Sequence, residues 1–321
     1  MKNLQLKGTD LNISNISFGT GNFKSNIDKE TAFNLMDYYV DLGGNFIDTA
    51  NVYCRWLPDT TNCSEQYIFE WLKSRNAYNK VVIASKGGHP SLLDGSTRVT
   101  KSELTKELDE SLMTLGLDCL DFYWFHRDNE ALPIEEVVEI GEYFVKAGKI
   151  RYFGASNYKL HRMEAAVDYS KNTSGNGFSA LSNQWSLAYP NDDKRLINDP
   201  TLVDVDAPYY QWLKKEQFPL IPFSSSSNGF FRKLETNTMK PAVSEAYTND
   251  RNMEIYKTLT MLKEKYNTDM AALSLAPIMH QDFQVIPVTA FSSKSQMTEM
   301  LAAGDLEISL EDMKLINKFF L

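Results

Sequence analysis

The segment DKETAFNLMDYYVDLGGNFIDTA (residues 28–50) contains the helix–strand unit on which the fold prediction rests. Asp28 is of a residue type that caps helices, and the paired glycines at 43 and 44 can end the helix. The apolar run NFIDTA (45–50) after the glycines is typical of a short strand. Alternation of helices and strands of this kind indicates a parallel sheet.

The same alternation continues along the rest of the chain. Strands are predicted at 16–21, 45–50, 81–87, 119–126, 150–157, 180–186, 220–225 and 283–290. Helices are predicted at 28–44, 64–75, 101–116, 134–148, 158–170 and 249–267. Eight strands in a chain of 321 residues favour a closed (β/α)8 TIM barrel of the α/β class, with residues 1–321 as a single domain. No GxGxxG motif follows the first strand, which disfavours an open dinucleotide-binding sheet.

Two long segments interrupt this alternation. Residues 187–206 and 226–248 are irregular and rich in turn-forming residues. Both follow predicted strands, at the end of the barrel where active sites lie. Long ordered loops in such positions are usually functional, so we expect long loops on the C-terminal face that shape a binding site.

Composition is typical of a globular protein and excludes several function classes. Hydrophobic residues make up 43% and charged residues 23%, which is ordinary for a folded domain. The net charge of −9 offers no attraction to nucleic acid or to an anionic membrane surface. No apolar run approaches the roughly 18 residues of a membrane span, and the start lacks a signal peptide's apolar stretch. The odd number of cysteines, without a CxxC pair, makes a reducing cytoplasm the expected compartment.

Four polar residues lie at or just after the ends of consecutive predicted strands. Asp48 ends the second strand, and Tyr53 follows in its loop. Lys86 ends the third strand, and His126 ends the fourth. Because all these strand ends point to one rim of a parallel barrel, the four side chains are expected to converge in one cavity.

The chemistry of these four residue types is complementary. A free tyrosine has a pKa near 10, and a nearby ammonium group favours its phenolate form. Lys86 could supply that charge, Asp48 could hold Lys86 in place, and His126 could orient a carbonyl oxygen. The phenol would then give its proton to the oxygen as hydride reaches the carbonyl carbon. General acid catalysis of this kind contributes roughly 100- to 10,000-fold.

Each of the four residues has an ordinary structural interpretation when it is taken alone. Asp48 could cap a turn, Tyr53 could be a packed aromatic, and Lys86 could be a solvated lysine. His126 follows an aromatic run and could be a core histidine. Only their joint placement at successive strand ends favours a catalytic site.

Four segments around these residues strongly resemble the aldo-keto reductase superfamily. GGNFIDTANVYCRW, with the later SEQ, resembles its Asp/Tyr segment, and VVIASKGG resembles its lysine strand. LDFYWFHRDN resembles its histidine strand, and GKIRYFGASNY its Ser-Asn strand. The resemblance runs from about residue 11 to 316. One such motif is weak, but four in the right order and spacing are highly specific.

The resemblance implies a barrel that reduces aldehydes and ketones with NAD(P)H and without a metal ion. By this resemblance, the residues that match the catalytic tetrad are Asp48, Tyr53, Lys86 and His126. Those that match contacts to the nicotinamide are Ser156, Asn157 and Gln184 for its carboxamide, and Phe223 for stacking on its ring. A flat apolar ring would hold the planar nicotinamide and block one of its faces.

The remaining cofactor predictions concern its phosphates. Ser224 and Ser226, in the run PFSSSSNGFF, could donate to the pyrophosphate, although a plain flexible loop is the alternative. Relatives that prefer NADPH usually have a basic residue soon after the last strand's Ile-Pro, whereas Val288 and Thr289 follow it here. Lys294 is the nearest cation and could reach a 2′-phosphate or be an ordinary exposed lysine. The polar cluster around Thr289 and Lys294 favours NADP(H), with NAD(H) also possible.

The substrate is expected to be a small carbonyl compound. Trp56 and Trp124 are predicted to line its pocket. Aromatic walls suit apolar or aromatic carbonyls, yet they also stack on the faces of sugars.

Three other function classes remain as alternatives. The first is a cofactor-binding regulatory barrel without a dedicated metabolic substrate, similar to the potassium-channel β-subunits of the superfamily. The second is a metal-dependent hydrolase, which is disfavoured because the four histidines include no HxH pair. The third is a Schiff-base aldolase, which is disfavoured because Asp48 would keep Lys86 charged and therefore non-nucleophilic.

Overall fold

The computed structural model describes residues 1–320, and its centre is a curved parallel sheet. Its seven strands lie in the order β8-β7-β6-β5-β4-β3-β9. Their bounds are β3 Ser17–Gly19, β4 Phe46–Asp48, β5 Val82–Gly87, β6 Leu120–Phe125, β7 Ile150–Ser156, β8 Leu181–Ser182 and β9 Val288–Thr289. Every pairing between neighbours is parallel. The order therefore follows the chain from β3 to β8, as helix-connected parallel strands require.

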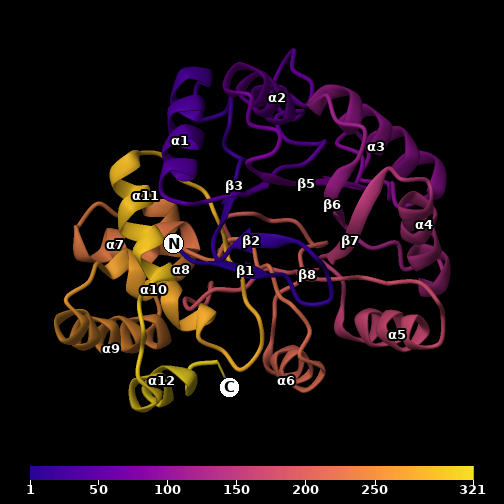
Figure 1. Ribbon diagram of the computed structural model, residues 1–321. Coiled ribbons are helices and arrows are strands. Elements are labelled where there is room, and N and C mark those ends of the chain that lie inside the picture. Colours follow the sequence, from indigo (N-terminus) through magenta and orange to yellow (C-terminus); the bar gives the residue numbers. More distant parts are fainter. Residues whose placement is uncertain (321) are drawn as a thin grey trace.

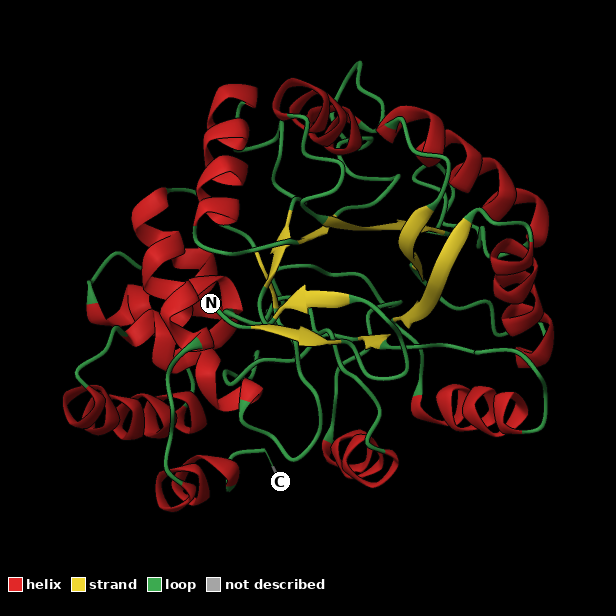
Figure 2. Ribbon diagram, viewed as in Figure 1, coloured by secondary structure: helices red, strands yellow, loops and turns green. Residues whose placement is uncertain are grey.

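The segment around Leu220 closes the sheet into a barrel. Leu220 forms parallel bridges with Leu181 on β8 and with Val285, just before β9. The Ile221 backbone N–H donates to the Leu181 carbonyl at 2.7 Å, and the Ile286 N–H donates to the Leu220 carbonyl at 2.9 Å. Figure 2 shows the sheet curling inside an outer layer of helices. The predicted (β/α)8 barrel with long loops on the C-terminal face is confirmed.

Helices surround the barrel (Figure 1). They are α1 Lys29–Asp41, α2 Cys63–Arg75, α3 Lys101–Leu115, α4 Ile134–Lys146, α5 Leu160–Lys171, α6 Ala207–Glu216, α7 Phe230–Glu235, α8 Pro241–Tyr247, α9 Asp250–Tyr266, α10 Met270–Met279, α11 Lys294–Leu301 and α12 Leu310–Asn317. The Asp28 side chain caps α1 by accepting a hydrogen bond from the Thr31 N–H at 2.8 Å. Gly43, with φ of 87°, follows the end of α1 and turns the chain toward β4.

An N-terminal hairpin packs against the interior of the barrel. Its strands are β1 (Asn3–Gln5) and β2 (Asn12–Ser14), and they pair antiparallel. Leu6, Leu11 and Ile13 of the hairpin share one buried cluster with barrel residues such as Phe46 at the start of β4. The hairpin therefore covers apolar side chains that would otherwise meet water at the amino ends of the strands.

The two segments expected to be irregular differ in structure. Residues 187–206 contain no helix or strand, as predicted. The prediction for 226–248 is wrong, because this segment holds a 3₁₀ turn, η1 (Ser227–Gly229), followed by α7 and α8. Phe230, Phe231 and Tyr247 of these helices are buried, so packing stabilises elements too short to show a clear period.

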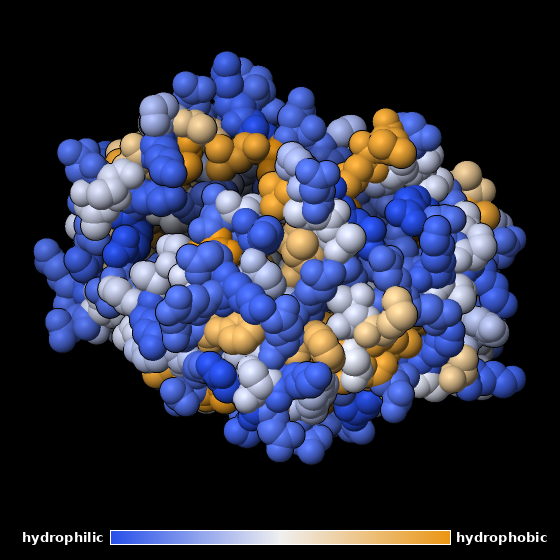
Figure 3. Space-filling view, turned by 90° about the horizontal axis from the view of Figure 1, so that it is seen from above, coloured by the Kyte–Doolittle hydropathy of each residue, from blue (hydrophilic) through white to orange (hydrophobic). Residues whose placement is uncertain are grey.

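The outer surface seen in Figure 3 is mostly hydrophilic, with apolar groups scattered over it. Such a surface fits helices whose apolar faces pack on the barrel. Among residues 1–320, no helix combines the length and apolarity needed to cross a membrane.

Candidate active site

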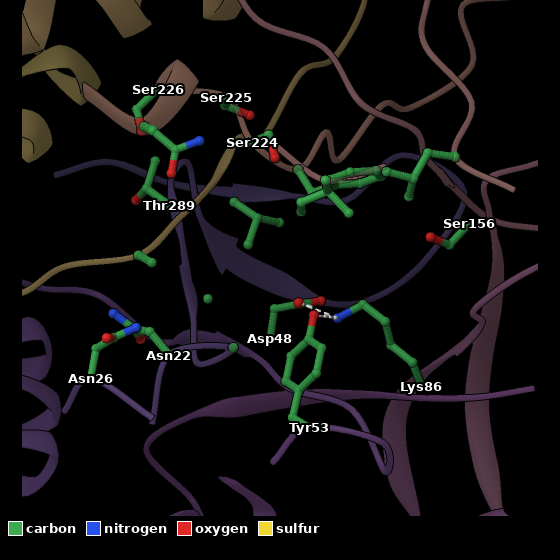
Figure 4. Close-up of a pocket in the computed structure, with 18 of the residues that line it drawn as sticks. Asn22, Asn26, Asp48, Tyr53, Lys86, Ser156, Ser224, Ser225, Ser226 and Thr289 are labelled. Atoms are coloured by element: carbon green, nitrogen blue, oxygen red, sulfur yellow. Dashed lines mark hydrogen bonds and ion pairs between the residues drawn. The ribbon is translucent and has the colours of Figure 1, made fainter. Parts of the chain in front are cut away.

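The four predicted catalytic residues lie together in one cavity of about 720 Å³. Asp48 is the last residue of β4, Lys86 lies next to the end of β5, and His126 directly follows β6. Tyr53 extends from the β4–α2 loop toward Asp48 and Lys86, as Figure 4 shows. The parallel strands bring the four together because their carboxyl ends share one rim of the barrel.

Lys86 is the centre of this polar group. Its ammonium forms an ion pair with Asp48 and donates to the Thr49 carbonyl at 2.8 Å and to the Tyr53 hydroxyl at 3.3 Å. Burial acts to lower the pKa of Lys86, but attraction to Asp48 and Tyr53 outweighs it and raises the pKa. Lys86 is therefore a fixed positive charge beside the Tyr53 phenol.

His126 is buried next to this group. Burial, followed by repulsion from Arg127, lowers the pKa of His126 well below its ordinary value, so the imidazole is neutral. The centre of its ring lies 6.1 Å from that of Tyr53. Its Nδ1 atom is buried and has no partner among the described residues. A neutral His126 ring beside Tyr53 can hydrogen-bond a substrate oxygen without itself giving that oxygen the proton that Tyr53 would supply.

Ser156 and Asn157, predicted to hold the nicotinamide carboxamide, both line the cavity at the end of β7. The Ser156 hydroxyl donates to the Ser182 carbonyl at 2.9 Å and accepts from the Asn157 amide at 3.0 Å. Asn157 also accepts from the Val203 N–H at 3.1 Å. These bonds fix both side chains and attach them to the loop at 187–206.

Ser224 and Ser226 line the part of the cavity that lies across from Asp48 and Tyr53 (Figure 4), and Phe223, directly before Ser224, also lines the cavity. Among the described residues, the hydroxyls of Ser224 and Ser226 have no hydrogen-bond partner, whereas Ser225 donates to the Pro222 carbonyl. Ser224 has a φ of 55°, which is an unfavourable conformation for a serine. The turn thus presents two free hydroxyls to the cavity.

Two further residues with a predicted role line the same cavity. Thr289, at the end of β9, is buried at its wall. Trp56 also lines it, and its ring centre lies 6.0 Å from that of Tyr53 with the rings edge to face. Trp56 is 48% exposed, so its surface is open to a ligand.

Three predicted residues lie outside the cavity lining. Gln184 pairs through its backbone with Asp204 and Phe223. Lys294 is exposed at the start of α11, with its ammonium 5.2 Å from the centre of the Tyr38 ring. Trp124 has no exposed surface and packs 4.5 Å from Phe122, centre to centre, inside the barrel. The prediction of Trp124 as a pocket wall is therefore wrong, because its position on β6 directs its side chain into the core.

Other polar lining residues were missed from the sequence. They are Asn22, Asn26, Lys233 and Gln296, and Ser292 of the polar cluster near Thr289 also lines the cavity. The buried Oδ1 of Asn22 has no partner among residues 1–320. Burial, and then repulsion from Lys240 and Arg232, lowers the pKa of Lys233. An anionic ligand would relieve this repulsion, so Lys233, in a cavity that also has free hydroxyl and amide groups, suits a phosphate or another anion.

Arg127 fixes the loop at 187–206 over the other side of the cavity. Its guanidinium donates to the Thr201 hydroxyl at 2.7 Å, to Asp199 at 2.8 Å and to the His126 carbonyl at 2.8 Å. Burial acts to raise the pKa of Asp199, but hydrogen bonds from Thr201 and Arg127 hold it down to about 2. In the sequence, Arg127 is visible only as an arginine directly after His126, and nothing there indicates its contact with Asp199 and Thr201.

Comparison with known proteins matches residues 15–320 to the sequence family described as the aldo/keto reductase family. Norsolorinic acid reductase from Emericella nidulans is 23% identical, over 94% of this chain and 77% of its own length. An aryl-alcohol dehydrogenase [NADP(+)] from Phanerodontia chrysosporium is 23% identical, over 91% and 76% respectively. A thermostable aldo-keto reductase crystallised with the inhibitor epalrestat is 19% identical, with a TM-score of 0.73 over 99% of this chain and 100% of that chain.

Proposed function

Because the chain belongs to the aldo/keto reductase family, we propose that this oxidoreductase reduces an aldehyde or ketone to an alcohol with NAD(P)H, using Tyr53 as the proton donor. The observation that carries the proposal is the Lys86 ammonium. It lies 3.3 Å from the Tyr53 hydroxyl while it is paired with Asp48. A fixed cation at this distance stabilises the phenolate that remains after the proton has left.

The roles of the four residues follow from their contacts. The Tyr53 hydroxyl and the neutral His126 ring bind the carbonyl oxygen and orient the carbonyl carbon. When bound, the reduced nicotinamide supplies the hydride. Tyr53 then gives its phenolic proton to the oxygen that becomes the alcohol, and Lys86 balances the negative charge left on the phenol. Asp48 keeps Lys86 charged and in position.

The residues around the cavity fit a nicotinamide dinucleotide. Phe223 would pack on the nicotinamide ring, and Ser156 and Asn157 would bind its carboxamide. Gln184, just outside the cavity lining, would support this contact through its pairing with Phe223. The free hydroxyls of Ser224 and Ser226 suit the pyrophosphate, and Thr289 lies along the same wall. The side-chain Oδ1 of Asn22, which has no partner among residues 1–320, suits a ribose hydroxyl or an adenine amino group. We propose NADP(H) as the preferred cofactor, with NAD(H) also accepted.

A titration of the purified protein with NADPH and with NADH tests this proposal directly. Tryptophan fluorescence would report binding, and a panel of aldehydes and ketones would then report turnover. Binding with oxidation of the cofactor by a carbonyl compound is the expected result. Binding without turnover over a broad panel would favour the regulatory alternative, and absence of binding to both cofactors would refute the proposal.

Lys233 is expected to contribute to cofactor choice. Replacing Lys233 with Gln should weaken NADPH binding by roughly tenfold, because the loss of one charge-assisted contact to phosphate is worth about 1.4 kcal/mol. NADH binding should change less if the contact is to the 2′-phosphate. Lys294→Ala is the matched control, since Lys294 lies outside the cavity, and it should change NADPH binding less than twofold. An equal loss for both cofactors would instead assign Lys233 to the pyrophosphate.

A further inference from the structure

We propose that His89 is a specificity-determining residue that selects carbonyl substrates bearing a hydroxyl group on the carbon next to the carbonyl. The substrate class would then be hydroxyaldehydes and hydroxyketones, including open-chain sugars. This inference rests on the proposed reductase function and concerns the part of the cavity beside the catalytic residues.

The backbone that leads to His89 is firmly held. Gly88, directly before it, donates its N–H to the buried carboxylate of Glu107 at 2.6 Å. Gly88 has a φ of 80°, and a Cβ atom there would lie 2.8 Å from the Val99 side chain. Pro90 follows and restricts the backbone on the other side. His89 therefore has a defined position at the end of β5, where it lines the cavity.

One hydrogen bond decides which nitrogen of His89 carries the hydrogen. Its Nδ1 lies 2.9 Å from the Pro90 carbonyl oxygen, which can only accept. Nδ1 must therefore donate, and in the neutral ring Nε2 is left as an acceptor. Burial, followed by repulsion from Arg127, lowers the pKa of His89, so the neutral ring predominates. Among residues 1–320, no group donates to Nε2, and this acceptor is left for a ligand.

The acceptor lies beside the groups that hold the substrate carbonyl. The ring centres of His89 and His126 are 5.0 Å apart, and those of His126 and Tyr53 are 6.1 Å apart. In the proposed mechanism Tyr53 and His126 donate hydrogen bonds to the carbonyl oxygen. His89, whose ring lies next to that of His126, offers an acceptor instead. A carbonyl oxygen cannot donate to it, but a hydroxyl on the adjacent carbon can.

Two charged residues on this side of the cavity, Arg127 and Asp199, are already engaged with each other and with Thr201. Arg127 donates to Asp199, Thr201 and its neighbour's carbonyl, and Asp199 accepts from both Arg127 and Thr201. Trp56 and Leu202 supply apolar surface. An aromatic face beside the free acceptor of His89 suits a short hydroxylated carbon chain better than a purely apolar one.

The test compares 2-hydroxypropanal with propanal, which differ only in the hydroxyl group. We would measure kcat/KM for both with the native protein and with His89→Phe, which keeps a flat ring but lacks the acceptor. The ratio of the two values is expected to fall by roughly tenfold in His89→Phe, the worth of one neutral hydrogen bond. His89→Gln, which restores an acceptor, should recover part of the ratio.

Leu93→Ser is the matched control. Leu93 is 99% exposed in the same loop, and the ratio should be unchanged in this variant. Comparing ratios between variants cancels the different intrinsic reactivity of the two aldehydes. An unchanged ratio in His89→Phe would overturn the role of His89. Absence of turnover of every carbonyl by the native protein would instead refute the reductase function, so the two failures are distinguishable.

Discussion

Replacing Tyr53 with Phe is expected to lower kcat by roughly 100- to 10,000-fold, the usual contribution of a positioned general acid. The substitution removes one hydroxyl and leaves the ring, which packs edge to face against Trp56. The Lys86–Asp48 ion pair does not depend on that hydroxyl. Single-turnover oxidation of bound NADPH would measure the chemical step, and fluorescence titration would measure cofactor affinity, which should change less than threefold.

A matched tyrosine gives the control for this variant. Tyr169 lies on α5 outside the cavity, and its hydroxyl donates to Glu139 at 2.6 Å. Tyr169→Phe removes the same hydroxyl group from the surface and should leave both kcat and cofactor affinity unchanged. Near-normal turnover in Tyr53→Phe would mean that another group, or water, delivers the proton.

The barrel could be predicted because its signals are local and repeated. Each helix start and each apolar strand is readable over a few residues, and Asp28 caps α1 as expected. Parallel pairing then places strand ends on one rim, which is why Asp48, Lys86 and His126 could be grouped without a structure. The N-terminal hairpin was missed because its strands, NLQ and NIS, contain one apolar residue each and so lack the apolar run that marks β4.

The direction of individual side chains was harder to predict. Trp124 and His126 are two residues apart on or after β6, but Trp124 turns into the barrel core while His126 lies at the cavity. Lys233 and Lys294 are both cations in polar surroundings, and only the fold decides which of them faces the cavity. Helix α7 brings Lys233 there through packing of Phe230 and Phe231, a tertiary contact that leaves no local signal.

Replacing Lys86 with Met is expected to abolish turnover and also to destabilise the fold by about 3–5 kcal/mol. The side chains of Lys86 and Asp48 are only 5% and 4% exposed, so the substitution leaves a carboxylate buried without its cation. Thermal unfolding, followed by circular dichroism, would measure the loss of stability. Turnover should be lost even for the folded fraction, because the charge that supports Tyr53 is absent.

A double substitution separates these two effects. Adding Asp48→Asn to Lys86→Met removes the unpaired charge, so the double variant should recover much of the lost stability. It should still lack turnover, since nothing then stabilises the Tyr53 phenolate. A double variant as unstable as Lys86→Met would show that packing, rather than the unpaired charge, causes the destabilisation. Recovery of turnover together with stability would show that Lys86 serves the fold and has no part in the chemistry.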